Sequence, residues 1–103
     1  MEEIFGVHVV VKGKVQGVGF RAFTEYQATQ KGLLGWVRNQ PDGTVELEAE
    51  GPKSVLEAFL LVLQEGPRFS HVTQMMVDWK DANRHTQGFI VLRGEPENFS
   101  SDA

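Results

Sequence analysis

A glycine-rich segment followed by an arginine is the first place where this sequence could do chemistry. Gly13, Gly17 and Gly19 fall within seven residues, and Arg21 follows at the expected start of a helix. Backbone N–H groups in such a loop, the positive end of the helix and a guanidinium group together can bind phosphate or carboxylate oxygens. The spacing matches neither common nucleotide-binding loop. A structural turn is the commoner meaning of such a pattern when it stands alone.

A second candidate is the segment Gly35-Trp36-Val37-Arg38-Asn39, which ends a predicted strand just before a turn. An asparagine in this position forms turns more often than it takes part in catalysis. Side-chain alternation along the strand directs Arg38 and Asn39 to opposite faces, so we expect Arg38 to be an exposed strand residue.

Hydrophobic periodicity indicates the elements that must position these residues. Alternating apolar and polar side chains predict strands over 5–11, 34–39, 44–51 and 73–79, with a short last strand over 89–92. Helical spacing predicts helices over 21–31 and 52–65. The first has a thin apolar stripe of Ala22, Phe23, Tyr26 and Ala28, and the second begins with a capping-box pattern at Ser54 and Glu57.

The order of these elements, β-α-β-β-α-β with an extra short strand, predicts an α+β fold. Two split β-α-β units in this order give a ferredoxin-like sandwich, in which an antiparallel sheet of four to five strands carries both helices on one face. The hairpin signal Asp42-Gly43 joins two of the strands. Glu46, Glu48 and Glu50 would then lie on the sheet face that is open to water, and His8 would lie there too.

Composition limits the classes of protein that the chain can represent. Its 103 residues suit one domain, which we expect over 4–94, with a polar and disordered tail over 95–103. The chain has no cysteine and a net charge of −4, with no long apolar run or signal-peptide pattern. We therefore expect a cytoplasmic protein, acting as a monomer, that binds neither nucleic acid nor membrane.

Together, the two candidate segments resemble the signatures of the acylphosphatase family. The first reads Val11-x-Gly13-x-Val15-Gln16-Gly17-Val18-x-Phe20-Arg21, and the second reads Gly35-Trp36-Val37-Arg38-Asn39-x-x-x-Gly43-x-Val45, with Gly51 closing it. The order of predicted elements over residues 4 to 94 also fits the fold of that family, so the resemblance covers nearly the whole chain.

The resemblance implies that the protein hydrolyses the carboxyl-phosphate bond of acyl phosphates, giving a carboxylate and inorganic phosphate without a metal or other cofactor. It implies two catalytic residues, Arg21, which would bind the phosphoryl group, and Asn39, which would orient the attacking water. The phosphate-binding loop implied by the family is Val15, Gln16, Gly17, Val18, Gly19 and Phe20. No general base is implied, because the bound phosphate itself would accept the proton of the water.

Two other classes of function fit the predicted fold. An RNA-binding module of this architecture stacks bases on exposed strand aromatics, but in this chain the corresponding strand presents Glu46, Glu48 and Glu50. A non-catalytic anion sensor would keep the loop and bind phosphate without turnover. His8, His71 and His85 are scattered without the spacing of metal ligands, and neither Ser54 nor Ser70 lies in a nucleophile elbow, so we assign none of them a role.

Overall fold

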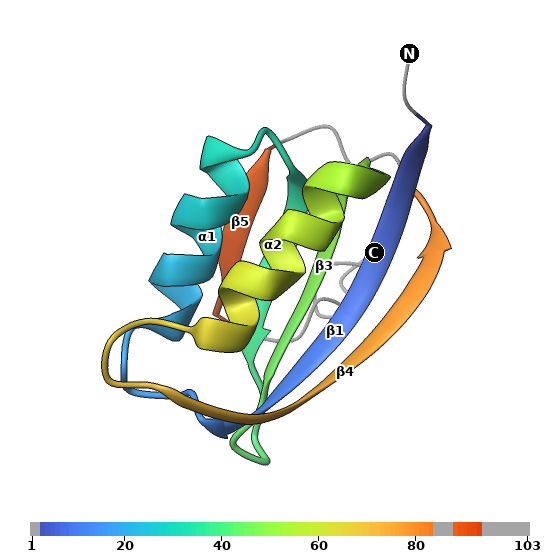
Figure 1. The fold of residues 1–103 in the computed structure, drawn as a ribbon. Coiled ribbons are helices and arrows are strands. Elements are labelled where there is room, and N and C mark those ends of the chain that lie inside the picture. Colours follow the sequence, from blue (N-terminus) through green and yellow to red (C-terminus); the bar gives the residue numbers. More distant parts are fainter. Residues whose placement is uncertain (1–2, 84–87, 94–103) are drawn as a thin grey trace.

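Five strands form one sheet in the order β4-β1-β3-β2-β5 in the computed structural model, which describes residues 3–83 and 88–93 (Figure 1). The strands are β1 (Ile4–Lys14), β2 (Leu34–Asn39), β3 (Val45–Pro52), β4 (His71–Asp81) and β5 (Phe89–Leu92). The strand β1 pairs antiparallel with both β3 and β4, and β2 pairs antiparallel with β3. The predicted tail 95–103 and His85 lie outside the described residues.

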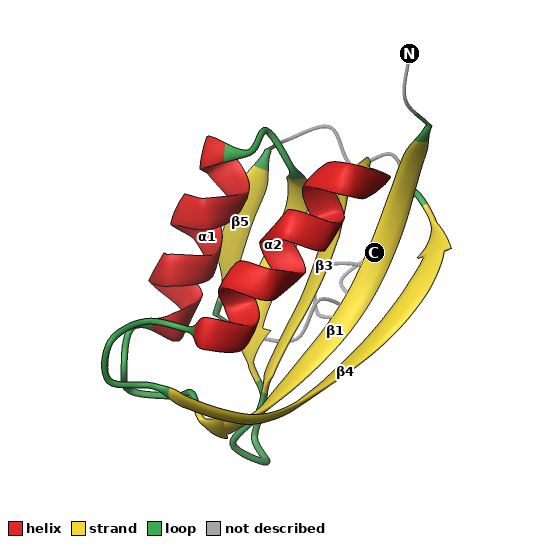
Figure 2. Cartoon of the chain, viewed as in Figure 1, coloured by secondary structure: helices red, strands yellow, loops and turns green. Residues whose placement is uncertain are grey.

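Helices α1 (Phe20–Gln30) and α2 (Lys53–Glu65) lie side by side on one face of this sheet (Figure 2). Each of them links two strands that run parallel to each other with a third strand between them, which is the split β-α-β connection. The predicted ferredoxin-like sandwich is therefore confirmed. Neither helix is long and apolar enough to cross a membrane.

The last strand departs from the expected antiparallel sheet. β5 pairs in parallel with β2, in a register that places Leu92 opposite Arg38. Strands β4 and β5 stand at opposite edges of the sheet, so the chain crosses the whole sheet between them rather than turning back in a hairpin. This crossing makes the sheet mixed, and it brings the end of β5 next to the end of β2.

The core lies between the helices and the sheet, and it is built from the side chains that alternation and helical spacing predict. Val7, Val9 and Val11 of β1 are fully buried, as are Val45, Leu47 and Ala49 of β3. From α2, the buried side chains are Leu56, Phe59 and Leu63. Phe20 at the start of α1 is 1% exposed, so the functional loop is attached directly to this core.

The buried stripe of α1 differs from the predicted one. Phe20, Thr24 and Ala28 face the core, whereas Ala22 is exposed and Tyr26 is 61% exposed. Thr24 tolerates full burial because its hydroxyl donates a 2.8 Å hydrogen bond to the Phe20 carbonyl oxygen one turn earlier. The prediction was therefore wrong for Ala22 and Tyr26, because the buried face of this helix includes a polar residue that the apolar pattern passes over.

The predicted capping box of α2 is also wrong. The helix begins at Lys53, and its N-cap is Pro52, which has an extended backbone and makes no side-chain capping hydrogen bond. Ser54 lies inside the helix, because β3 runs through Pro52 directly into it without an intervening loop. The end of α2 at Gly66 agrees with the sequence, since its positive φ of 71° is a backbone conformation that glycine favours.

Arg38 and the row of glutamates lie on the sheet face opposite the helices, but they are not the solvated surface that the sequence suggests. Arg38 is only 6% exposed, and its Nε donates a 2.6 Å hydrogen bond to Oε1 of Glu46, directly opposite it on β3. His8 contacts the other oxygen of Glu46 at 2.6 Å, and Lys80 binds Glu48 at 2.7 Å. Neighbouring strands therefore pair Glu46 and Glu48 with cations, which alternation within a single strand cannot reveal. Glu50 is also buried, at 4% exposed, and accepts a hydrogen bond from the backbone N–H of Asn83.

Candidate active site

The loop between β1 and α1 is held at both of its ends by buried side chains. Val15 and Phe20 are each 1% exposed, whereas Gly17 and Gly19 between them are open to solvent. Both glycines have positive φ, 76° and 80°, although a Cβ at either position would meet no atom within 4 Å. They are therefore required by backbone conformation rather than by lack of space, and they let the loop curl into the first turn of the helix.

Helix α1 begins directly from this loop. Gly19 is its N-cap, with no side-chain hydrogen bond, and the first turn contains no acidic residue. The partial positive charge of the helix start is therefore not neutralised by a carboxylate of that turn. Arg21, half-buried in the same turn, adds a permanent charge and a fork of N–H donors.

Asn39 reaches the site from the sheet. It is the last residue of β2, two positions after the fully buried Val37, so alternation places its side chain on the face that the helices cover. Its Oδ1 atom is buried and has no hydrogen-bond partner in the part of the chain that the structure describes. An unsatisfied buried acceptor is rare in folded proteins, and the residue that carries this one is part of a pocket wall.

The loop and the strand are linked through the side chain of Gln16. Its Nε2 donates hydrogen bonds of 2.8 Å to the carbonyl oxygens of both Gln40 and Thr44, on the two sides of the β2–β3 turn. That turn is itself closed by Asp42, whose Oδ1 accepts from the hydroxyl and the backbone N–H of Thr44. These two hydrogen bonds favour the ionised form and lower the pKa of the Asp42 carboxyl below its ordinary value.

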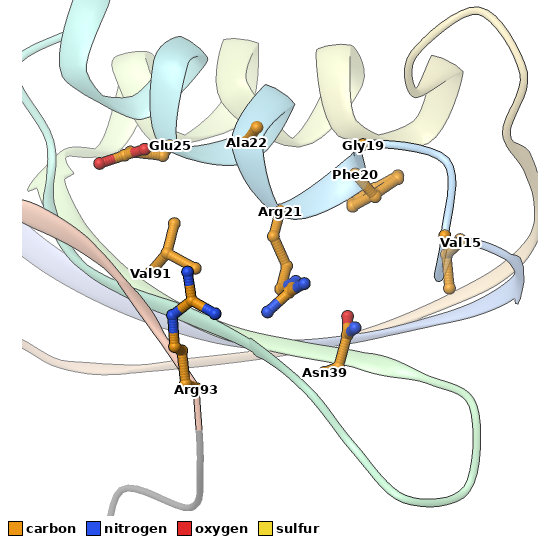
Figure 3. A pocket seen from close by; sticks show the side chains of 10 residues that line it. Val15, Gly19, Phe20, Arg21, Ala22, Glu25, Asn39, Val91 and Arg93 are labelled. Carbon is orange, nitrogen blue, oxygen red and sulfur yellow. The ribbon is translucent and has the colours of Figure 1, made fainter.

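Arg21 and Asn39 face each other in one pocket of about 350 Å³ (Figure 3). The pocket is also lined by Val15, Gly17, Gly19, Phe20, Ala22, Glu25, Val91 and Arg93. The structure thus brings together the two predicted catalytic residues and four of the six predicted loop residues. Gln16 is directed to the turn instead, and Val18 packs half-buried against the core.

Sequence reasoning missed the wall of the pocket that β5 provides. Val91 belongs to this strand and Arg93 follows its last residue, and both line the cavity. The parallel register pairs Arg38 with Leu92, so Arg93 follows Leu92 at the sheet end where Asn39 follows Arg38. Only the pairing of the strands carries this information, and the sequence contains no local signal for it.

The pocket resembles neither a metal site nor a nucleophile elbow. Nowhere in the described ranges do three His, Asp or Glu side chains gather as the ligands of a metal would. The pocket instead offers backbone N–H groups at a helix start, two guanidinium groups and one amide. This set of groups can bind a tetrahedral anion and hold a water molecule beside it.

Comparison with known proteins identifies the family. The family model for acylphosphatase matches residues 7–91. An acylphosphatase of Salinibacter ruber is 49% identical over 83 residues, which are 81% of this chain and 87% of that protein. One of Geobacillus thermodenitrificans is 42% identical over 88 residues, which are 85% of this chain and 94% of that protein.

A solved structure agrees with these sequence relatives. The crystal structure of acylphosphatase from Bacillus subtilis superposes with a TM-score of 0.82 at 38% identity, covering 85% of this chain and 98% of that one. The match therefore includes the fold and nearly the full length of the relatives. On this evidence, the chain belongs to the acylphosphatase family, the hydrolases that act on acyl phosphates.

Proposed function

We propose that Arg21 and Asn39 are the catalytic residues of this hydrolase, and that the loop over Val15 to Phe20 binds the phosphoryl group of the substrate. The observation that carries the proposal is the position of the buried, unsatisfied Oδ1 of Asn39 in the same pocket as the Arg21 guanidinium, among the described residues. One group supplies a hydrogen-bond acceptor for water and the other supplies positive charge for phosphate. Both are fixed by the core, Asn39 through β2 and Arg21 through α1.

In this mechanism, the loop N–H groups and Arg21 hold the equatorial phosphoryl oxygens while Asn39 orients a water molecule toward phosphorus. The water oxygen forms a bond to phosphorus as the bond between phosphorus and the acyl oxygen breaks. The acyl group leaves as a carboxylate with both electrons of that bond, and the proton of the water passes to the phosphate. Positioning and charge stabilisation are what phosphoryl transfer chiefly requires.

The chemistry of the leaving group explains why acyl phosphates suit this pocket. A carboxylate has a pKa of about 4 for its conjugate acid, so it leaves as an anion without needing a proton from the enzyme. An alcohol leaving group is far more basic and needs a general acid. A guanidinium group does not act as such an acid and an amide does not ionise, so neither Arg21 nor Asn39 can supply that proton.

Further parts of the proposal concern metal, assembly and location. Hydrolysis proceeds without a metal, because a guanidinium group and the helix start supply the positive charge. We also propose that the protein works as a monomer, since a single chain supplies both Arg21 and Asn39 to the pocket. We place it in the cytoplasm, which suits a chain without cysteine.

The direct test is hydrolysis of benzoyl phosphate, followed by the loss of its ultraviolet absorbance in the presence of EDTA. We expect turnover well above the uncatalysed rate, unaffected by the chelator, and competitive inhibition by inorganic phosphate. Phosphate binding by the folded protein with no turnover would instead indicate the anion sensor. Turnover that EDTA abolishes would refute the metal-free mechanism.

A further inference from the structure

The pocket contains a second arginine that the proposed mechanism does not use. Arg93 follows β5, and its guanidinium group lies in the same cavity as that of Arg21 (Figure 3). The described part of the chain offers Arg93 no hydrogen bond or ion pair. Glu25 is the one acid in the lining, and its side chain projects away from both guanidinium groups in Figure 3. The wall near Arg93 is therefore positively charged.

The in-line geometry of phosphoryl transfer indicates which part of a substrate would contact the pocket wall at Val91 and Arg93. The attacking and leaving oxygens of a phosphoryl transfer lie roughly in line with phosphorus between them. When the attacking water lies between Asn39 and phosphorus, the acyl group must extend from phosphorus in the direction away from Asn39. In Figure 3, Arg21 lies between Asn39 on one side and Val91 and Arg93 on the other. Arg93 and Val91 thus line the space where the acyl group extends.

We propose that Arg93 makes this pocket select acyl phosphates whose acyl group carries a second anionic group, a carboxylate or another phosphate. This inference rests on the proposed function, since it assumes that the phosphoryl group is held by the loop and Arg21. Val91 would contact the carbon chain, and the guanidinium of Arg93 would bind the distal anion through paired N–H donors. Arg93 is a specificity-determining residue in this account.

The exposed guanidinium of Arg93 favours an anionic rather than a neutral acyl group. The proposed phosphoryl site uses Arg21 and the loop, so the N–H donors of Arg93 stay available for a distal anion. Attraction between opposite charges would add to these hydrogen bonds. A neutral acyl group gains only apolar contact with Val91 and leaves the guanidinium of Arg93 to water.

The test compares substrates that differ only in the distal group. Benzoyl phosphate and 4-methylbenzoyl phosphate are neutral at the distal position, whereas 3-carboxybenzoyl and 4-carboxybenzoyl phosphate carry a carboxylate. A 4-phosphonobenzoyl phosphate distinguishes a preference for phosphate from one for carboxylate. The readout is the ratio of kcat/KM for each anionic substrate to kcat/KM for 4-methylbenzoyl phosphate, measured for wild type, Arg93→Gln and Arg93→Lys.

Arg93→Gln should lower this ratio roughly fivefold, the size of a well-formed exposed ion pair, and Arg93→Lys should retain part of it. Raising the salt concentration should reduce the preference of the wild type and leave that of Arg93→Gln unchanged, because salt screens exposed charges. Arg68→Gln is the matched control. Arg68 is exposed, lies outside the pocket and contacts the ring of Phe69, so this variant should keep the wild-type ratio.

Failure of this inference can be told apart from failure of the proposed function. A wild type that hydrolyses none of these substrates contradicts the function. A wild type that hydrolyses them all, with a ratio that changes less than twofold in Arg93→Gln, contradicts only the role of Arg93. An equal loss on neutral and anionic substrates, together with weaker inhibition by inorganic phosphate, would mean that Arg93 binds the phosphoryl group instead.

Discussion

The side-chain amide nitrogen of Gln16 donates a 2.8 Å hydrogen bond to the carbonyl oxygen of Gln40, the residue that follows Asn39. A second donor hydrogen of the same amide reaches the carbonyl oxygen of Thr44, also at 2.8 Å. The phosphate-binding loop and the strand end that carries Asn39 come from distant parts of the sequence. Gln16 fixes their relative position without itself lining the pocket.

Gln16→Met keeps the length of this side chain and removes both donors. Two hydrogen bonds of roughly 1 kcal/mol each are lost, so the loop shifts relative to Asn39 and kcat/KM for benzoyl phosphate should fall about tenfold. The loss should fall mainly on kcat, measured at a temperature where the variant is fully folded. Gln64→Met on the exposed side of α2 is the control. A lower melting temperature with unchanged kcat would show that Gln16 is only structural.

Arg21→Ala should lower kcat/KM and weaken inhibition by inorganic phosphate together, because the guanidinium binds the phosphoryl group in both cases. Charge-assisted hydrogen bonds of about 1.5–3 kcal/mol predict a loss of roughly 10-fold to 100-fold or more. The kcat/KM of Arg21→Lys should lie between those of the wild type and Arg21→Ala, since lysine keeps the charge but not the paired donors. Steady-state kinetics with phosphate as inhibitor measures both effects, and an unchanged inhibition constant in Arg21→Ala would contradict this role.

Asn39→Ala should lower turnover without weakening phosphate binding, whereas Arg21→Ala lowers both. Loss of the amide removes the group that orients water, so kcat should fall about 100-fold or more, the size of effect seen when one preorganised hydrogen-bonding group is removed from an active site. The inhibition constant of inorganic phosphate should stay within roughly twofold of the wild type, because the loop and Arg21 remain. Parallel losses in turnover and phosphate affinity would assign Asn39 to phosphate binding.

The carboxylate of Glu46 should contribute strongly to stability. It binds both Arg38 and His8, and Arg38 is buried. Glu46→Ala leaves the Arg38 guanidinium without this partner, so the free energy of unfolding should fall by about 3 kcal/mol. Urea unfolding followed by tryptophan fluorescence measures the change. Glu65→Ala at the exposed end of α2 should stay within about 0.5 kcal/mol of the wild type. A similar small change in Glu46→Ala would contradict the role of the pair.

Sequence reasoning agrees with the structure best where the signal lies within one segment. The alternation over β1 and β3 places Val7, Val9, Val11, Val45 and Leu47 in the core. The two segments that resemble family signatures contain Arg21 and Asn39, which line one pocket. These features depend on residues close together in the chain. The curl of the loop at Gly17 and Gly19 follows from the residue types alone, since glycine adopts positive φ at little cost.

Features that depend on strand pairing could not be predicted. Arg38 is bound by Glu46, which lies opposite it on β3, and Arg93 reaches the pocket because β5 runs parallel to β2. Neither relationship leaves a periodic signal in one segment. The misjudged stripe of α1 has a different origin, since Thr24 is buried through a hydrogen bond to its own helix rather than through apolar character.

Hydrolysis of benzoyl phosphate in water enriched in oxygen-18 tests most directly the claim that the pocket positions water for attack at phosphorus. Mass spectrometry of the products shows which bond breaks. We predict that each turnover places one labelled oxygen in the inorganic phosphate and none in the benzoate, because the bond between phosphorus and the acyl oxygen is broken. Label in the benzoate would mean that water attacks the carbonyl carbon, and it would contradict the proposed roles of Arg21 and Asn39.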